Sequence, residues 1–177
     1  MSPMASGLVN MELNRGDGSL GTFLGVAVRT GHEVLASTRN AVTWGGLGHA
    51  TAAYEIALSY SQQREQCGRP LASFQLVQDT FVLMRAEVTA MQLYCLRLAQ
   101  LSELGQLTDT MASLAKLNNT REVLLAAREV LGGNGILLDD HVMRHLADIE
   151  ALYTSEGTAD IQELIVGREI TGISAFV

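Results

Sequence analysis

Proline, cysteine and charged side chains are all scarce in this chain of 177 residues. Its two prolines, Pro3 and Pro70, leave long stretches over which nothing prevents a helix from continuing. Its two cysteines, Cys67 and Cys95, have no CxxC or metal-ligand spacing, so we expect free thiols in a reducing compartment. Charged residues make up 18 % and hydrophobic residues 47 %, which is the composition of a globular protein rich in buried helices.

Basic residues are also too few and too scattered to form a nucleic-acid footprint. Lysine and arginine total 12 against 19 acidic residues, and the formal net charge is −7. The first residues lack the charged and apolar regions of a signal peptide, and no apolar run is long enough to cross a bilayer. We therefore expect a cytoplasmic protein with no membrane span and no nucleic-acid partner.

Helical patterns separated by glycine and proline fill most of the chain. They predict a short helix over about 5–14, a junction over about 29–40, and helices over about 42–64, 77–101, 109–131, 138–151 and 159–173. No segment shows the alternation of a β-strand. The sequence therefore predicts an all-α fold, an antiparallel helical bundle of four to five helices with short connections.

Two of these helices have patterns that predict how they pack. In the first long helix, the small residues Gly48, Ala52 and Ala53 allow another helix to approach closely. In the next, apolar residues recur at spacings of four and three, which is typical of an amphipathic helix. These residues are Val77, Phe81, Met84, Val88, Met91, Cys95 and Leu98. A second stripe predicts burial on more than one side, and consists of Leu83, Ala86, Ala90 and Leu93.

The most informative local feature is a carboxylate beside a glycine, in a loop just before a helix. This is Glu156, in the segment Glu156-Gly157-Thr158. Taken alone, the segment is more simply interpreted as the start of a helix. In that interpretation Asp160, with Glu163 three residues further on, forms a capping box.

Two turns contain residues that suit phosphate binding. The run Gly132-Gly133-Asn134-Gly135 allows a backbone to approach a phosphate closely, although it matches neither a P-loop nor a dinucleotide fingerprint. The alternative for this run is a helix C-cap with a tight turn. Arg64 and Gln75 flank the turn Cys67-Gly68-Arg69-Pro70, where a guanidinium could hold a phosphate by two hydrogen bonds. The alternative for Arg64 is an exposed loop side chain.

The histidines offer a weaker pattern. His141 and His145 lie four residues apart with Asp148 three further on, so they share a helix face that could bind a metal. The HExxH pattern is absent, because Val142 follows His141. We interpret this face as solvated and predict no metal site. His49 stands alone in a helix of small residues, and we interpret it as a packing residue.

Four segments, in the right order and at the right separations, resemble the acyl-CoA dehydrogenase family. Arg64–Leu71 resembles the family's R-x-Q-F-G-x-P-L turn, and Phe74–Gln78 the start of its next helix. Leu131–Ile136 resembles the L-G-G-N-G turn, and Glu156-Gly157-Thr158 the E-G-T segment that holds the catalytic glutamate in many members. The resemblance covers about Leu35–Val177, the carboxy-terminal helical domain. The ending is most similar to the glutaryl-CoA and short-chain-like branch.

The resemblance implies a FAD-dependent dehydrogenase that acts on an acyl-CoA substrate. Glu156 would remove the proton alpha to the thioester, and FAD would accept a hydride from the beta carbon. Thr158 and Asp160 fall where family members contact FAD. An electron-transfer flavoprotein would accept the electrons.

Further residues fall at positions where the family binds FAD across a subunit boundary. Glu129, Gly132 and Gly133 fall in the dinucleotide contact region. Arg64 and Gln75 would reach the FAD of a neighbouring subunit. The resemblance therefore implies a homo-oligomer, either a dimer or a tetramer.

Some features depart from the family pattern. Ser155 replaces the usual tyrosine, and Cys67 replaces the usual phenylalanine. Residues 1–34 resemble a remnant of the amino-terminal helical domain with a junction, followed by the carboxy-terminal bundle over 35–177, so the middle β-domain is expected to be missing. The alternative to a dehydrogenase is a non-catalytic helical oligomerisation or binding module descended from the family.

Overall fold

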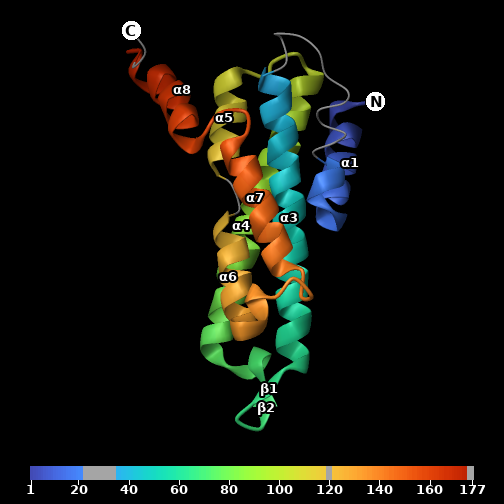
Figure 1. Cartoon of the computed structure of the whole chain (residues 1–177). Coiled ribbons are helices and arrows are strands. Elements are labelled where there is room, and N and C mark those ends of the chain that lie inside the picture. Colours follow the sequence, from blue (N-terminus) through green and yellow to red (C-terminus); the bar gives the residue numbers. More distant parts are fainter. Residues whose placement is uncertain (22–34, 119–120, 175–177) are drawn as a thin grey trace.

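The computed structural model describes residues 1–21, 35–118 and 121–174, and these parts of the chain are mainly helical (Figure 1). The α-helices are α1 (Pro3–Gly16), α3 (Leu35–Gln63), α4 (Gln75–Glu103), α5 (Asp109–Leu117), α6 (Arg121–Leu131), α7 (Val142–Thr154) and α8 (Ala159–Thr171). Two short strands and two 3-10 turns join them, namely β1 (Glu65–Gln66), β2 (Arg69–Pro70), η2 (Leu71–Ser73) and η3 (Gly132–Ile136). The predicted all-α fold class is confirmed. No helix in the described ranges combines the length and hydropathy needed to cross a membrane.

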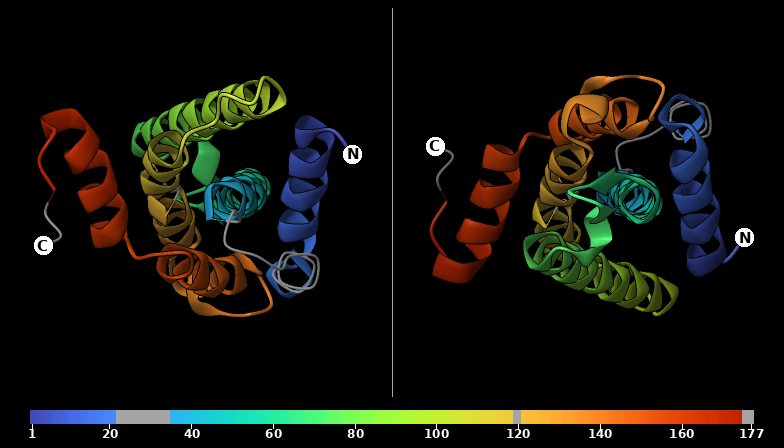
Figure 2. Two further views of the ribbon diagram at one scale, coloured as in Figure 1. Left: turned by 90° about the horizontal axis from the view of Figure 1, so that it is seen from above. Right: turned by 90° about the horizontal axis from the view of Figure 1, so that it is seen from below.

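Helix α3 is the central element of the molecule. Viewed along its axis, α1, α4, α7 and the pair α5 and α6 lie around it (Figure 2). Every residue from Thr43 to Ala50 is buried, so this stretch has no solvent face. A helix enclosed on all sides needs small and apolar residues around its whole circumference, which explains why this segment lacks an amphipathic stripe.

The long helices alternate in direction, as the sequence predicts. Helix α3 leads into a tight hairpin in which Glu65 pairs with Pro70 and Gln66 with Arg69. Helix α4 then returns, α5 and α6 run back in series, and α7 returns again (Figure 1). Helix α8 lies outside this bundle and packs against α5.

Several predicted helix boundaries were wrong. Helix α3 begins at Leu35, inside the predicted junction, whose residues 29–34 lie outside the described ranges. The predicted third helix is divided into α5 and α6, because the backbone leaves the helical conformation at Asn118, where ψ is 44°. Thr108 is the N-cap residue of α5, and its side chain accepts a hydrogen bond of 3.2 Å from the amide of Met111. Helix α7 begins at Val142, later than predicted, after the left-handed His141.

The two stripes predicted on α4 have different outcomes. The first stripe from Phe81 to Leu98 is buried in the core against α3 and α6. The second stripe is exposed in the single chain, since Leu83 is 61 % and Leu93 62 % exposed. The prediction of burial on a second side is therefore wrong for the isolated chain, which presents an apolar outer face on this helix.

Helix α1 packs along α3 through small residues, as the sequence predicts for the Gly48 region. Gly7 faces the ring of Trp44, and Gly48 faces the backbone of α1 at Met11. An ion pair of 2.6 Å between Arg15 and Glu55 joins the same two helices. The close approach therefore depends on positions that have no side chain.

Substitution of Gly48 by alanine is expected to weaken this helix pair. The added β-carbon would overlap the carbonyl oxygen of Met11 and lie 3.0 Å from the amide nitrogen of Arg15, so α1 must move away. We expect the free energy of unfolding to fall by about 1–2 kcal/mol in urea titrations. Gly167→Ala is the control, because no described atom lies within 4 Å of its β-carbon, and it should stabilise α8 slightly. Equal effects of the two substitutions would contradict this account of α1.

Candidate active site

The loop between α7 and α8 has an unusual backbone. Glu156 has a φ of 57° and Gly157 a φ of 96°, so two consecutive residues are left-handed. Glycine adopts this conformation freely, but a glutamate does so only when surrounding contacts enforce it. The conformation of Glu156 therefore requires an explanation from its neighbours.

Three side chains from other elements hold the carbonyl groups of this loop. Lys116 of α5 donates to the carbonyl of Ser155 at 2.5 Å and also to that of Gly157. Gln162 of α8 donates to the carbonyl of Glu156 at 2.9 Å, and Arg39 of α3 donates to the same oxygen at 3.3 Å. We call Lys116, Arg39 and Gln162 the loop clasp. The clasp fixes the backbone on both sides of the glutamate.

The clasp is itself buried and electrostatically linked. Arg39 is 5 % exposed and forms an ion pair of 2.5 Å with Asp109 at the start of α5. Lys116 is 4 % exposed and is the single lysine among the 177 residues. Burial first, and the nearby Arg39 second, lower the pKa of Lys116 to about 8, while Glu156 acts in the opposite direction. Three helices thus converge on the loop.

The carboxylate of Glu156 is half-buried at this end of the bundle. It accepts a hydrogen bond of 2.9 Å from the hydroxyl of Thr38, near the start of α3. The simpler interpretation, a capping box that begins at Asp160, is wrong, because α8 begins at Ala159 with Thr158 as its N-cap residue. Asp160 lies in the first turn of α8, and both it and Thr158 are exposed beside the loop.

The other predicted FAD contacts lie at the opposite end of the bundle. Arg64 and Gln75 are exposed on either side of the hairpin that follows α3, and Glu129 is exposed near the end of α6. Gly132 has a φ of 59°, and no described atom lies within 4 Å of a β-carbon placed at Gly132 or Gly133. Helix α3 separates the two ends by about 40 Å, at 1.5 Å per residue. One chain therefore does not bring the two sets of residues together.

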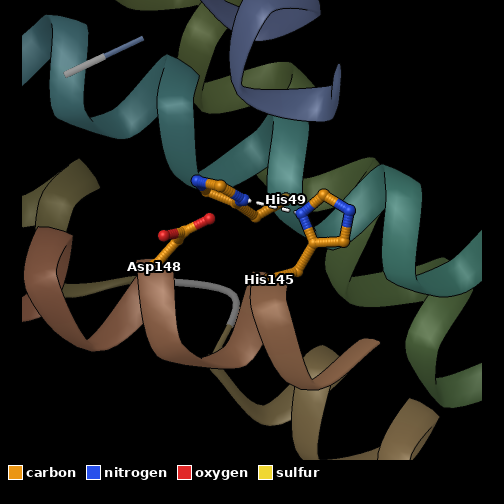
Figure 3. Close-up of side chains that lie close together, drawn as sticks. All are labelled: His49, His145 and Asp148. Atoms are coloured by element: carbon orange, nitrogen blue, oxygen red, sulfur yellow. Dashed lines mark hydrogen bonds between the residues drawn. The ribbon is translucent and has the colours of Figure 1, made fainter. Parts of the chain in front are cut away.

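A histidine cluster lies between α3 and α7 (Figure 3). His49 and His145 are buried, and their Nδ1 atoms lie 2.9 Å apart. Asp148 is half-buried beside them. The solvated face predicted for His145 is thus wrong, while His141, its expected neighbour, is exposed at the N-cap of α7. His49 packs in the core as predicted but also pairs with His145, which its surroundings in the sequence did not indicate.

The family model described as the C-terminal domain of acyl-CoA dehydrogenase matches residues 28–171. The chain belongs to the acyl-CoA dehydrogenase family. The predicted family and the predicted C-terminal-domain fold are both confirmed.

Relatives within the acyl-CoA dehydrogenase family include glutaryl-CoA dehydrogenases. The enzyme of Desulfococcus multivorans is 30 % identical over 143 residues, which are 78 % of this chain and 37 % of that protein. A crystal structure of glutaryl-CoA dehydrogenase from Mycobacterium smegmatis has a TM-score of 0.79 and 38 % identity, covering 82 % of this chain and 38 % of its own. A structure in complex with FADH2, from the same organism, has a TM-score of 0.78 and 32 % identity, covering 81 % and 38 %. The chain spans less than half the length of these relatives.

Proposed function

We propose that this chain provides the catalytic base of a FAD-dependent acyl-CoA dehydrogenase, and that Glu156 is that base. The observation that carries the proposal is the loop clasp, which holds a half-buried glutamate in a left-handed conformation. A buried lysine, arginine and glutamine together donate to the carbonyl groups of this loop. Backbone strain of this kind is concentrated at functional sites.

The residues of the loop suit proton abstraction next to a thioester. Glu156 would take the proton from the carbon alpha to the carbonyl, and its backbone N–H would hold the thioester oxygen as negative charge develops there. FAD, when bound, supplies the acceptor for the hydride from the beta carbon. The hydrogen bond from Thr38 sets the orientation of the carboxylate before the substrate arrives. The clasp keeps the amide of Glu156 in place during the proton transfer.

The exposed polar residues at the two ends of the bundle fit FAD only if they come from different chains. Thr158 and Asp160 lie beside Glu156, whereas Arg64 and Gln75 lie about 40 Å away, more than an extended dinucleotide can span. Glu129, Gly132 and Gly133 lie near this far end, where the glycines leave open space. In a homo-oligomer, one chain would contribute its Glu156 end and another its Arg64 end. Other polypeptide would supply the remaining walls, because the chain spans only 37–38 % of its relatives.

The visible absorbance spectrum of the purified protein tests this function. We expect the absorbance band of a bound flavin, after incubation with FAD if necessary, and bleaching of that band by an acyl-CoA. Free flavin removed by gel filtration, with none retained, would contradict FAD binding by this chain. A flavin band that no acyl-CoA bleaches would contradict the dehydrogenase activity while leaving FAD binding intact.

A second candidate function is a helical oligomerisation module without catalysis. The specific observation that favours it is the apolar outer face of α4, because exposed apolar surface of this kind marks association sites. The large exposed side chains on this helix are Leu76, Val82, Leu83, Leu93, Tyr94 and Leu96. Oligomerisation through this face is common to both functions, so flavin binding distinguishes them.

The double substitution Leu83→Glu and Leu93→Glu is expected to weaken association. Both side chains are more than 60 % exposed, so two charges there leave the fold of one chain intact but must be desolvated when chains associate. We expect the concentration at which the oligomer dissociates to rise at least about tenfold in analytical ultracentrifugation. The control is Glu87→Gln, an exposed residue of the same helix. An unchanged mass in the double variant would place the interface elsewhere.

A further inference from the structure

The histidine cluster brings together three metal-binding side chains from two helices. His145 and Asp148 are three residues apart on α7, which places them on one helix face, and His49 faces them from α3. One ligand atom from each residue lies within 4.8 Å of the others. Figure 3 shows all three side chains in one space between the two helices. Imidazole nitrogen and carboxylate oxygen are among the ligands that Zn²⁺ takes in proteins.

The hydrogen bonding of His49 is incomplete without a further ligand. Its Nδ1 pairs with Nδ1 of His145, but its Nε2 is buried and has no hydrogen-bond partner among the described residues. A buried polar atom without a partner is costly, and a bound ion or water is the usual remedy. Figure 3 draws this second nitrogen on the side of Asp148. The side chain is fully buried, so the unpartnered nitrogen points into the cluster and not into solvent.

Both rings are kept in the neutral form that binds metals. Burial, together with the neighbouring His145, lowers the pKa of His49 to about 3. Burial, followed by the charges of Arg144 and His141, lowers the pKa of His145. A cation therefore does not have to displace protons from these rings at neutral pH. Asp148 supplies the negative charge of the set.

Gly18 covers the cluster, and a cavity reaches one of its three residues, His145. Gly18 packs directly over it, because a β-carbon there would lie 2.6 Å from a carboxylate oxygen of Asp148 and 2.8 Å from the ring of His49. On the other side, a cavity of about 260 Å³ opens beside His145, with His141 and Arg144 in its wall. Arg144 is held by an ion pair of 3.1 Å with Asp17, which compensates its charge.

We propose that His49, His145 and Asp148 form a binding site for one divalent transition-metal ion, with Zn²⁺ as the ion tested, that links α3 to α7. Three protein ligands leave a fourth position, which water from the cavity would fill. His49 would bind the ion through Nε2, the nitrogen that has no hydrogen-bond partner among the described residues, and its Nδ1 would stay beside Nδ1 of His145.

Zinc titration of the purified full chain against a chromophoric chelator tests the site. We expect one Zn²⁺ per chain, and at least about tenfold weaker affinity in Asp148→Asn and in His145→Ala. His141→Ala is the matched control. His141 is exposed and precedes His145 by four residues, and its variant should bind Zn²⁺ with the affinity of the unmodified chain. Zn²⁺ should also raise the melting temperature of the unmodified chain and of His141→Ala, but not of Asp148→Asn.

The measurements distinguish the loss of a metal-binding side chain from unfolding of the variant. Asp148 is half-buried and its asparagine is nearly isosteric, so helical circular dichroism should be unchanged in that variant even if His145→Ala unfolds. Stoichiometric binding that disappears in folded Asp148→Asn supports the site. No saturable Zn²⁺ binding by the unmodified chain, or equal affinities in Asp148→Asn and His141→Ala, would overturn it. The flavin spectrum plays no part in this test, so its result is independent of the proposed enzymatic activity.

Discussion

Glu156→Gln is expected to lower the rate of α-proton exchange of an acyl-CoA by about 100- to 10,000-fold. The amide keeps the size of the side chain and can still interact with the hydroxyl of Thr38, but it cannot take the proton. The clasp bonds the backbone of residue 156 and not its side chain, so the loop should keep its conformation. Exchange with solvent deuterium, followed by NMR of the thioester, measures the proton transfer alone.

The matched control for this substitution is Glu163→Gln. Glu163 is an exposed carboxylate on α8, seven positions further along the chain, and the same charge is lost. We expect its exchange rate and its flavin content to equal those of the unmodified protein. Similar rates in the two variants would exclude Glu156 as the base. Loss of flavin in Glu156→Gln alone would instead assign the residue to cofactor binding.

Lys116→Met is expected to lower the free energy of unfolding by about 3 kcal/mol near pH 7. Two hydrogen bonds from a charged donor are lost, and the carbonyl of Ser155 is left in a partly buried environment without this partner. Gly157 keeps a second donor, since Gln162 also reaches its carbonyl at 3.1 Å. Urea titration gives the stability. Any residual proton exchange should fall as well, because the amide of Glu156 is no longer held.

The same residue makes stability depend on pH. The pKa of Lys116 is about 8 in the folded chain and about 10.5 in the unfolded one, so between these values the unfolded chain binds more protons. The stability that depends on this group is therefore fully present above about pH 10.5 and is lost as the pH falls through about 8. The stability difference between the unmodified chain and Lys116→Met should widen by about 2 kcal/mol between about pH 7 and about pH 9.5.

Lys116→Arg is the control for this pH effect. Arginine keeps a donor at the same position and stays charged throughout this pH range. Its stability difference from Lys116→Met should therefore stay constant between the two pH values. Tyrosines and cysteines that titrate in this range are common to all three proteins, so their contributions cancel. A constant difference for the unmodified chain as well would show that Lys116 does not titrate there.

The amphipathic part of the fold could be predicted from the sequence, because its signal lies in local periodicity. The stripe from Phe81 to Leu98 and the cap at Thr108 depend only on neighbours within a turn or two. Helix α3 was predicted only from about residue 42, seven residues after its start, because its first two turns show no clear period in the sequence. The break between α5 and α6 at Asn118 was not predicted, because no glycine or proline marks it in the sequence.

In the candidate site, Glu156 was predicted because its neighbours resemble a family segment, whereas its own residue pattern favoured a helix cap. Lys116, Arg39 and Gln162 were missed, because each is a single polar residue in a helical pattern and they meet only in the fold. His49 and His145 are 96 residues apart, so no spacing rule connects them. The signal that could have revealed them is a polar residue on an otherwise apolar helix face.

The burial of the chain's single lysine has a consequence for its chemistry with amine reagents. While the protein is folded, the ε-amino group is enclosed beneath the α7–α8 loop, and these 177 residues contain no other lysine. Acylation, amine cross-linking and any lysine-directed tagging therefore find almost no acceptor on the native surface. Opening of the loop exposes that amine, so the appearance of modified Lys116 in mass spectrometry reports directly on how often the Glu156 end of the bundle opens.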